Sequence, residues 1–340
     1  MKEISILISR YRDCLMGVAI LGVMIAHCKI GWPPSIIGKL IGVLCYSVFT
    51  GGFFFLSGFG LFYSLQSHPD TKSFYLKRIK RFIVPWLIVS IPYFLISDML
   101  INGGDWLKFI LHVTTVSFWF YGNYSGMWYI SVIMIMYLVY PLYHYFAYNK
   151  NRGGLFLIGI QSIIVVTEIV LASLCPSYYD MIKICFPFAL FFIGSYFASI
   201  SCLDESSEKR AKSLAPRLVY GAEFVAVDIL IPSLRWHLMR IYNIISIQLF
   251  AVFFQFLENY KIGKAILNLL RWFGKYTMEL YMIHLFIYCL LKAIAPESMN
   301  PNILFPISVL IAISVCAPVH AIIDKINAFL FRPEKKGLAY

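Results

Sequence analysis

Apolar runs of about 18–20 residues recur along the whole sequence, and no other feature constrains the fold as strongly. Each run is long enough to cross the hydrocarbon core of a bilayer as an α-helix. The composition agrees, since 60% of the 340 residues are hydrophobic and 14% are charged, against about 45–50% and about 25% in ordinary globular domains. The sequence therefore predicts an all-α, polytopic membrane protein.

We predict about ten transmembrane helices in one bundle, which form a single domain over residues 1–340 with no separate soluble part. The predicted spans are 13–31, 40–65, 82–101, 126–147, 154–175, 181–200, 217–233, 241–258, 277–295 and 303–323. The stretch 106–122 is apolar but short and carries Lys108 and His112, so we expect an interfacial or re-entrant piece there. Prolines inside several spans predict kinks. No small-residue cleavage site follows the first apolar run, so no cleaved signal peptide is expected.

The basic residues predict the orientation of the chain. With the N-terminus in the cytoplasm, 22 of the 29 Lys and Arg residues fall in the inner segments. This is the asymmetry of the positive-inside rule, so we expect both termini in the cytoplasm. The net charge of +12 then reflects membrane orientation, and nucleic-acid binding is not expected. The eight cysteines form no CxxC pair and no metal-type spacing, so we expect neither a metal site nor a disulfide framework.

Two groups of residues are candidates for chemistry. His27 lies 14 residues beyond Asp13, roughly 21 Å further along a helix, and an imidazole there is a candidate general base. The alternative is an interfacial histidine bonded to a neighbouring helix. Arg78 and Arg81 are three residues apart and share one face of an α-helix, where two guanidiniums suit phosphate. Topological anchoring and attraction to anionic lipid are equally open for this pair.

Other candidates have a strong structural alternative. Ser57 lies in the run Phe53 to Phe59, Phe-Phe-Phe-Leu-Ser-Gly-Phe, where small residues favour close helix packing. Trp128 and Tyr129 open a span as either substrate-stacking or interfacial aromatic residues. Tyr281 and His284 are three apart on another span. Three carboxylates fall within apolar segments and favour a transporter or flippase for a glycolipid or small solute as the alternative function. They are Glu168, Glu223 and Asp228.

The order of the motifs resembles a known family. Arg12-Asp13 precedes an apolar span that ends in His27. There follow the run Phe53 to Phe59, Arg78-x-x-Arg81 with Pro85, Met127 to Ser131 (Met-Trp-Tyr-Ile-Ser), and Gly274 to His284 (Gly-Lys-Tyr-Thr-Met-Glu-Leu-Tyr-Met-Ile-His). From about residue 10 to about 325 the chain resembles integral-membrane acyltransferase family 3, whose members O-acylate surface carbohydrates.

The resemblance implies a specific reaction. An acyl group, usually acetyl, passes from cytoplasmic acetyl-coenzyme A to a hydroxyl of a surface carbohydrate or lipid-linked sugar outside the membrane. By this resemblance His27 is the catalytic histidine, and Arg78 and Arg81 bind the phosphates of the donor, with Ser57 in the same donor site. Trp128, Tyr129, Tyr281 and His284 are the candidate acceptor-binding residues. The implied location is a bacterial cytoplasmic membrane, with membrane lipids as further partners and no metal.

One position departs from the family pattern. The family pairs its histidine with an arginine eleven residues earlier on the same helix, and here that residue is Met16. Arg12 lies one turn below, about 60° off the face of the histidine, and its long side chain can reach upward into the same space. We therefore expect Arg12 to assist. The departure also leaves a catalytically degenerate membrane scaffold or sensor as a third reading.

Overall fold

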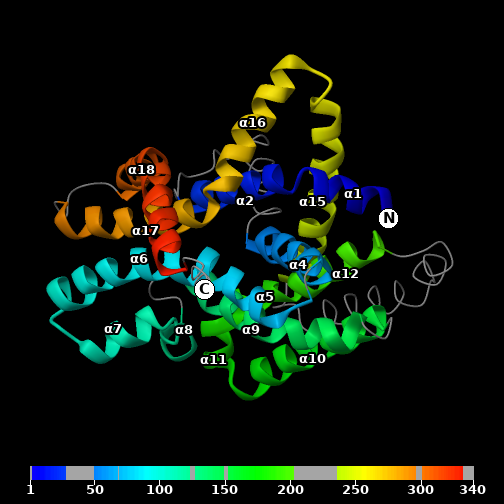
Figure 1. The fold of residues 1–340 in the computed structure, drawn as a ribbon. Coiled ribbons are helices and arrows are strands. Elements are labelled where there is room, and N and C mark those ends of the chain that lie inside the picture. The colour runs from blue at the N-terminus through cyan, green and yellow to red at the C-terminus, as the bar shows by residue number, and fades with distance from the viewer. Residues whose placement is uncertain are drawn as a thin grey trace, which may run out of the picture. The chain divides into compact units, whose positions relative to one another are not determined.

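The chain is helical throughout the part that the structure describes. This computed structural model describes residues 2–27, 50–67, 69–122, 127–148, 152–202, 236–295 and 301–331, and all regular secondary structure there is helical (Figure 1). The chain divides into two compact units. Unit 1 comprises residues 1–74 and 114–277, and unit 2 comprises residues 75–113 and 278–340.

The helices of unit 1 alternate between long apolar segments and short connecting turns. They are α1 (Lys2–Arg10), α2 (Arg12–His27), α4 (Thr50–Ser67), α8 (Ser117–Tyr121), α9 (Trp128–Tyr148), α10 (Gly153–Leu174), α11 (Pro176–Ile182), the 3₁₀ turn η3 (Lys183–Phe188), α12 (Ala189–Ile200), α15 (Trp236–Leu257) and α16 (Lys261–Lys275). Those of unit 2 are η1 (Ile79–Ile83), α6 (Val84–Phe94), η2 (Leu95–Ile101), α7 (Trp106–Val113), α17 (Thr277–Ile294) and α18 (Pro301–Leu330). The helix α5 (Thr71–Arg78) crosses the boundary between the units.

Several of these helices can cross a membrane. Among the described residues, six helical segments are long and apolar enough: 71–101, 128–148, 153–174, 176–200, 277–294 and 303–330. They confirm an all-helical, multi-pass membrane protein. The predicted span 217–233 lies outside the described residues, as do parts of 13–31 and 40–65. The stretch 106–122 forms the short helices α7 and α8, and neither is long enough to cross a bilayer.

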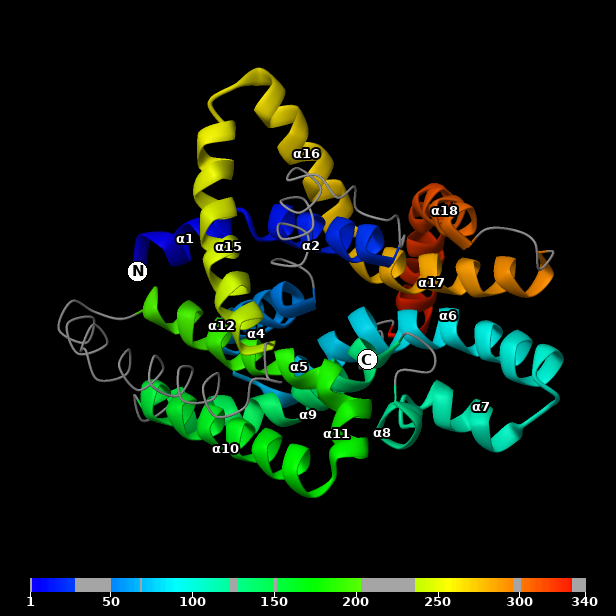
Figure 2. The same cartoon turned by 180° about the vertical axis from the view of Figure 1, so that it is seen from behind.

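Unit 1 is held together by close helix contacts at glycines. A Cβ on Gly58 of α4 would collide with the backbone oxygen of Phe191 in α12, and one on Gly194 would collide with that of Phe55. The helices α2 and α16 cross in the same way, with Gly17 against Leu270 (Figures 1 and 2). Small residues permit this close approach, which is how membrane helices associate without a hydrophobic driving force.

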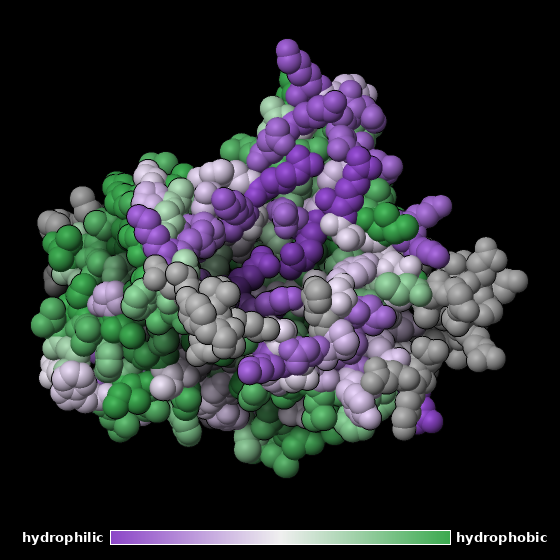
Figure 3. Space-filling model, in the orientation of Figure 1, coloured by the Kyte–Doolittle hydropathy of each residue, from purple (hydrophilic) through white to green (hydrophobic). Residues whose placement is uncertain are grey.

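The helix α16 has an outer polar face. Hydrophilic side chains gather over it in Figure 3, and they include the exposed Lys261, Lys264, Asn268, Arg271 and Lys275. Its opposite face packs on α2 through Leu267 and Leu270, which are buried. No predicted span covers this stretch, which falls between the predicted spans 241–258 and 277–295. An amphipathic pattern of this kind instead gives a helix that packs with one face.

A single helix runs from Thr71 to Ile101, with its residues from Tyr75 onward in unit 2, and it contains two π turns. The first, η1, comes just before Pro85, and the N–H of Val84 bonds to the carbonyl of Ile79. Proline removes a donor and clashes with the carbonyl four residues earlier, and the wider turn relieves that clash. The second, η2, follows Pro92. The segment before the predicted span 82–101 is therefore helical and continuous with it.

Candidate functional site

The guanidinium of Arg12 is held between α2 and α4. Its Nε donates to the carbonyl of Leu56 at 3.3 Å, and its Nη1 lies 3.9 Å from a carboxylate oxygen of Asp13. The guanidinium also lies against Gly60, where an added Cβ would come within 2.7 Å of Nη2. The side chain therefore reaches across to α4, and Gly60 provides the space that it occupies.

His27 is the last residue of α2, and its side chain is partly exposed. It lies 15 residues beyond Arg12 on the same helix, so the two backbone positions are roughly 22 Å apart. Since the Arg12 guanidinium is bonded to α4, the structure does not bring these two side chains together. The general-base role of His27 stays a prediction, and so does the assisting role of Arg12.

Ser57 lies on a closely packed turn of α4. It is buried, it follows Leu56, whose carbonyl binds Arg12, and it precedes Gly58, which contacts α12. The serine and the arginine are thus fixed around the same turn of α4. This placement explains the small residues of the run Phe53 to Phe59 by packing.

Trp128 and Tyr129 begin α9 and pack into the core of unit 1. The ring centre of Tyr129 lies 4.9 Å from that of Phe54 and 5.8 Å from that of Phe53. Trp128 contacts Phe54 and Phe118 at longer distances, and both side chains are buried. These contacts are all with other aromatic rings, which favours a packing role over stacking on a substrate.

In unit 2 the candidate donor-binding arginines flank the first π turn. Arg78 is the last residue of α5 and half-buried, whereas Arg81 lies within η1 and is exposed. A π turn takes more residues than an α turn. Arg78 and Arg81 are therefore separated by a larger angle around the helix axis than they would be in an α-helix. The widened turn is bound by α18, because the side-chain amide of Asn327 donates to the carbonyl of Lys80 at 3.0 Å.

Tyr281 and His284 are both buried within α17. Nδ1 of His284 lies 2.6 Å from the carbonyl of Leu280, so this nitrogen donates within its own helix. The ring of Tyr281 lies edge-on to that of His284 at 6.2 Å. The ring centre of Phe305 in α18 lies 5.6 Å from that of the imidazole. The structure therefore brings this pair together inside unit 2.

Two acid–imidazole pairs of unit 2, one buried and one partly buried, were not predicted from the sequence. Nδ1 of His112 in α7 lies 2.6 Å from a carboxylate oxygen of Asp98 in η2, and both side chains are buried. Nδ1 of His320 in α18 lies 2.5 Å from Glu279 in α17. The partners lie 14 and 41 residues apart on separate helical segments, so the periodicity of a single helix does not mark them. A charged residue inside an apolar segment was the available signal.

Only one of the three carboxylates that favour a transporter lies in the described residues. Glu168 of α10 is 1% exposed, whereas Glu223 and Asp228 lie outside the described residues. In the described part of the chain, no group of three or more His, Cys, Asp or Glu side chains has the arrangement to hold a metal ion. The six cysteines there are free, and Cys14, Cys185 and Cys316 are buried.

Comparison with known proteins identifies the family. No curated protein and no solved structure matches the chain. A family model described as an acyltransferase domain matches residues 10–321. The match covers most of the chain and includes residues of both compact units. The chain therefore belongs to acyltransferase family 3.

Proposed function

We propose that this protein is a membrane O-acyltransferase that moves an acetyl group from acetyl-coenzyme A to a hydroxyl of an extracytoplasmic carbohydrate or glycolipid. The observation that carries the proposal is the family match over residues 10–321. The multi-pass helical architecture supports a reaction in which donor and acceptor lie on opposite sides of a membrane. A bacterial cytoplasmic membrane is the proposed location.

The donor is proposed to bind at the basic turn that contains Arg78 and Arg81. Lys77 and Lys80 lie in the same stretch, and coenzyme A carries phosphates that pair with such groups. The contact between Asn327 and the carbonyl of Lys80 fixes the backbone between the two arginines. This arrangement supports a preorganised phosphate site in the first third of the helix from Thr71 to Ile101.

The chemical step is a direct transfer with His27 as general base. His27 takes the proton from the acceptor hydroxyl as its oxygen attacks the thioester carbonyl. The bond between the carbonyl carbon and sulfur then breaks, and the thiolate receives a proton to give an ester and free coenzyme A. Arg12 of α2 is proposed to take part through its guanidinium, which lies against α4, in the absence of the family arginine at Met16.

Donor binding is tested with purified protein in nanodiscs. We expect saturable binding of acetyl-coenzyme A that weakens at least about tenfold in the Arg78→Ala/Arg81→Ala variant, because charge-assisted hydrogen bonds are lost. A Lys261→Ala/Lys264→Ala variant is the matched control, since it removes the same charge from exposed positions of α16. Equal weakening in both variants would contradict a specific phosphate site.

The role of His27 is tested by transfer activity in the same preparation. The His27→Ala variant is expected to bind the donor like the wild type and to lose acetyl transfer to the acceptor. Retention of full transfer by this variant would overturn the assignment. Loss of donor binding as well would place His27 in binding or folding instead of the chemical step.

A transporter or flippase is the second candidate function, and the buried carboxylate of Glu168 favours it. Charged groups inside membranes are costly and commonly line solute or proton pathways. Binding of acetyl-coenzyme A separates the two functions. An enzyme should bind it and lose this binding in the Arg78→Ala/Arg81→Ala variant, whereas a transporter has no reason to bind it. A degenerate scaffold is the third candidate, and Met16 motivates it; such a protein would show no transfer with any acceptor.

A further inference from the structure

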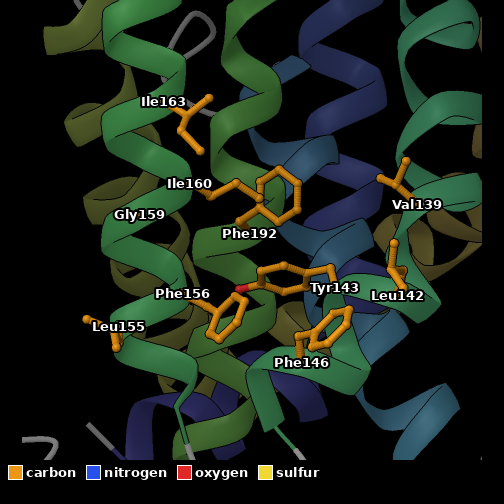
Figure 4. A pocket seen from close by; sticks show the side chains of 10 residues that line it. All are labelled: Val139, Leu142, Tyr143, Phe146, Leu155, Phe156, Gly159, Ile160, Ile163 and Phe192. Carbon is orange, nitrogen blue, oxygen red and sulfur yellow. The ribbon is translucent and has the colours of Figure 1, made fainter.

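An apolar groove runs along the outside of unit 1 between α9 and α10. Its volume is about 530 Å³, and α12 contributes Phe192 to its lining. Figure 4 shows the side chains that line it, with the ring of Tyr143 extending across from α9 toward Phe156 of α10. Apart from the Tyr143 hydroxyl, the side chains that line it are hydrocarbon. A sugar would find few hydrogen-bonding partners there.

The groove exists because one residue of α10 has no side chain. A Cβ built on Gly159 meets no atom within 4 Å, so the space above this residue is open. Leu142 of α9 and Ile163 of α10 also line the groove, and they are 63% and 65% exposed. The rings of Phe146 and Phe156 lie nearly parallel at 6.3 Å and form one end. Both helices carry spans long enough to cross a membrane, so these exposed apolar walls face lipid.

A basic residue, Arg152, lies three positions before Leu155, the first residue of α10 that lines the groove. Arg152 precedes α10, and its backbone N–H donates to the carbonyl of Ala147, next to Phe146, at 2.9 Å. Its side chain is exposed. In the described part of the chain, no carboxylate forms an ion pair with Arg152. The basic-residue pattern assigns this end of α10 to the cytoplasmic side.

We propose that the groove binds one acyl chain of an anionic phospholipid of the cytoplasmic leaflet, with its phosphate at Arg152. From Leu155 to Ile163 the groove extends roughly 12 Å along α10, which suits the upper part of one acyl chain. The hydrocarbon walls match the chain, and the guanidinium matches the phosphate. This site is independent of the proposed transferase activity.

The experiment is native mass spectrometry of the delipidated full-length protein titrated with phosphatidylglycerol or with phosphatidylcholine of the same chain length. The wild type is expected to retain phosphatidylglycerol preferentially. In the Gly159→Leu variant the added side chain fills the open space, and we expect affinity for both lipids to fall at least about tenfold. In the Arg152→Gln variant we expect the preference for phosphatidylglycerol to fall about fivefold.

Two control variants make these effects specific. Val166→Leu enlarges an exposed residue of α10 outside the groove, and Lys264→Gln removes an exposed charge from α16. Both are expected to bind lipid like the wild type. The melting temperature of the Gly159→Leu variant should not fall, since leucine favours helix more than glycine does.

Three outcomes would overturn the proposal. In the first, the Gly159→Leu and Val166→Leu variants bind lipid equally. In the second, the Arg152→Gln variant keeps the full preference for phosphatidylglycerol. In the third, the Gly159→Leu variant changes the oligomeric state but leaves lipid binding unchanged, which would make the groove a contact between two copies of the chain.

Discussion

At the scale of single residues, Arg10 and Tyr11 bind the same carboxylate oxygen of Glu258. The hydroxyl of Tyr11 donates to it at 2.5 Å, and Nη2 of Arg10 lies 2.7 Å away. The hydrogen bond from Tyr11 and the charge of Arg10 lower the pKa of Glu258. Burial and the same hydrogen bond raise the pKa of Tyr11 to about 12. These contacts join the turn between α1 and α2 to the residue that follows α15.

The directions of these pKa shifts determine the pH dependence. A lowered pKa in the folded state means that Glu258 stabilises the fold above its unfolded pKa of about 4.3. That contribution is lost as pH falls through the lowered value. The raised pKa of Tyr11 affects stability at high pH. The contribution of Tyr11 to the stability of the fold is complete below about pH 10 and is lost as pH rises through about 12.

We predict that Tyr11→Phe lowers the free energy of unfolding by about 1 kcal/mol at neutral pH, because one hydrogen bond to a carboxylate is removed. The difference from the wild type should shrink as acid protonates Glu258. Thermal unfolding in detergent, from neutral pH down to well below the unfolded pKa of about 4.3, measures both effects. Tyr260→Phe is the control, since this tyrosine is exposed. A difference that does not change with pH would argue against the carboxylate as the partner.

Sequence alone identifies candidate residues better than it identifies their partners. Arg12 stood out by its place before an apolar run, yet its acceptor is the backbone carbonyl of Leu56, and a carbonyl has no signature in the sequence. The glycine that makes room for it, Gly60, looks like any other small residue of a span. His320 was not predicted to pair with Glu279, because contacts between separate helices have no fixed spacing.

At the scale of helices, the mutual contact of α4 and α12 depends on Gly58 and Gly194. We predict that Gly194→Ala destabilises the protein by about 1–3 kcal/mol, because the new methyl group meets the backbone of Phe55, which cannot move away independently. Gly159→Ala is the matched control: its Cβ meets open space, and it should stabilise by up to about 1 kcal/mol. Thermal unfolding of both variants tests this, and equal effects would contradict the close contact.

The ends of several helices could be predicted because turn residues interrupt the apolar runs. The predicted spans 126–147, 154–175 and 277–295 agree with α9, α10 and α17 within two residues at each end. The continuous helix from Thr71 to Ile101 was not predicted as one unit, because a basic stretch reads as a loop when periodicity alone is used. The π turns around its prolines depend on backbone strain, which a hydropathy pattern does not report.

At the scale of the whole molecule, the alternation of inner and outer segments determines which substrates reach which residues. Two cysteines are placed to report it. Cys175 is exposed at the junction of α10 and α11, and Cys202 is exposed after α12. The basic-residue pattern places Cys175 outside, and it places Cys202 on the cytoplasmic side together with Arg78 and Arg81.

We predict that a membrane-impermeant maleimide added to intact cells modifies Cys175 and leaves Cys202 unmodified, as measured by peptide mass spectrometry of the unmutated protein. After permeabilisation both should react, because both are exposed, and this treatment is the control for accessibility. The result bears directly on the chemistry. Modification of Cys202 in intact cells would mean that the chain has the opposite orientation. The arginine pair would then lie outside, where no coenzyme A is available. The donor site proposed at Arg78 and Arg81 would then be untenable, whereas family membership, which rests on the match over residues 10–321, would stand.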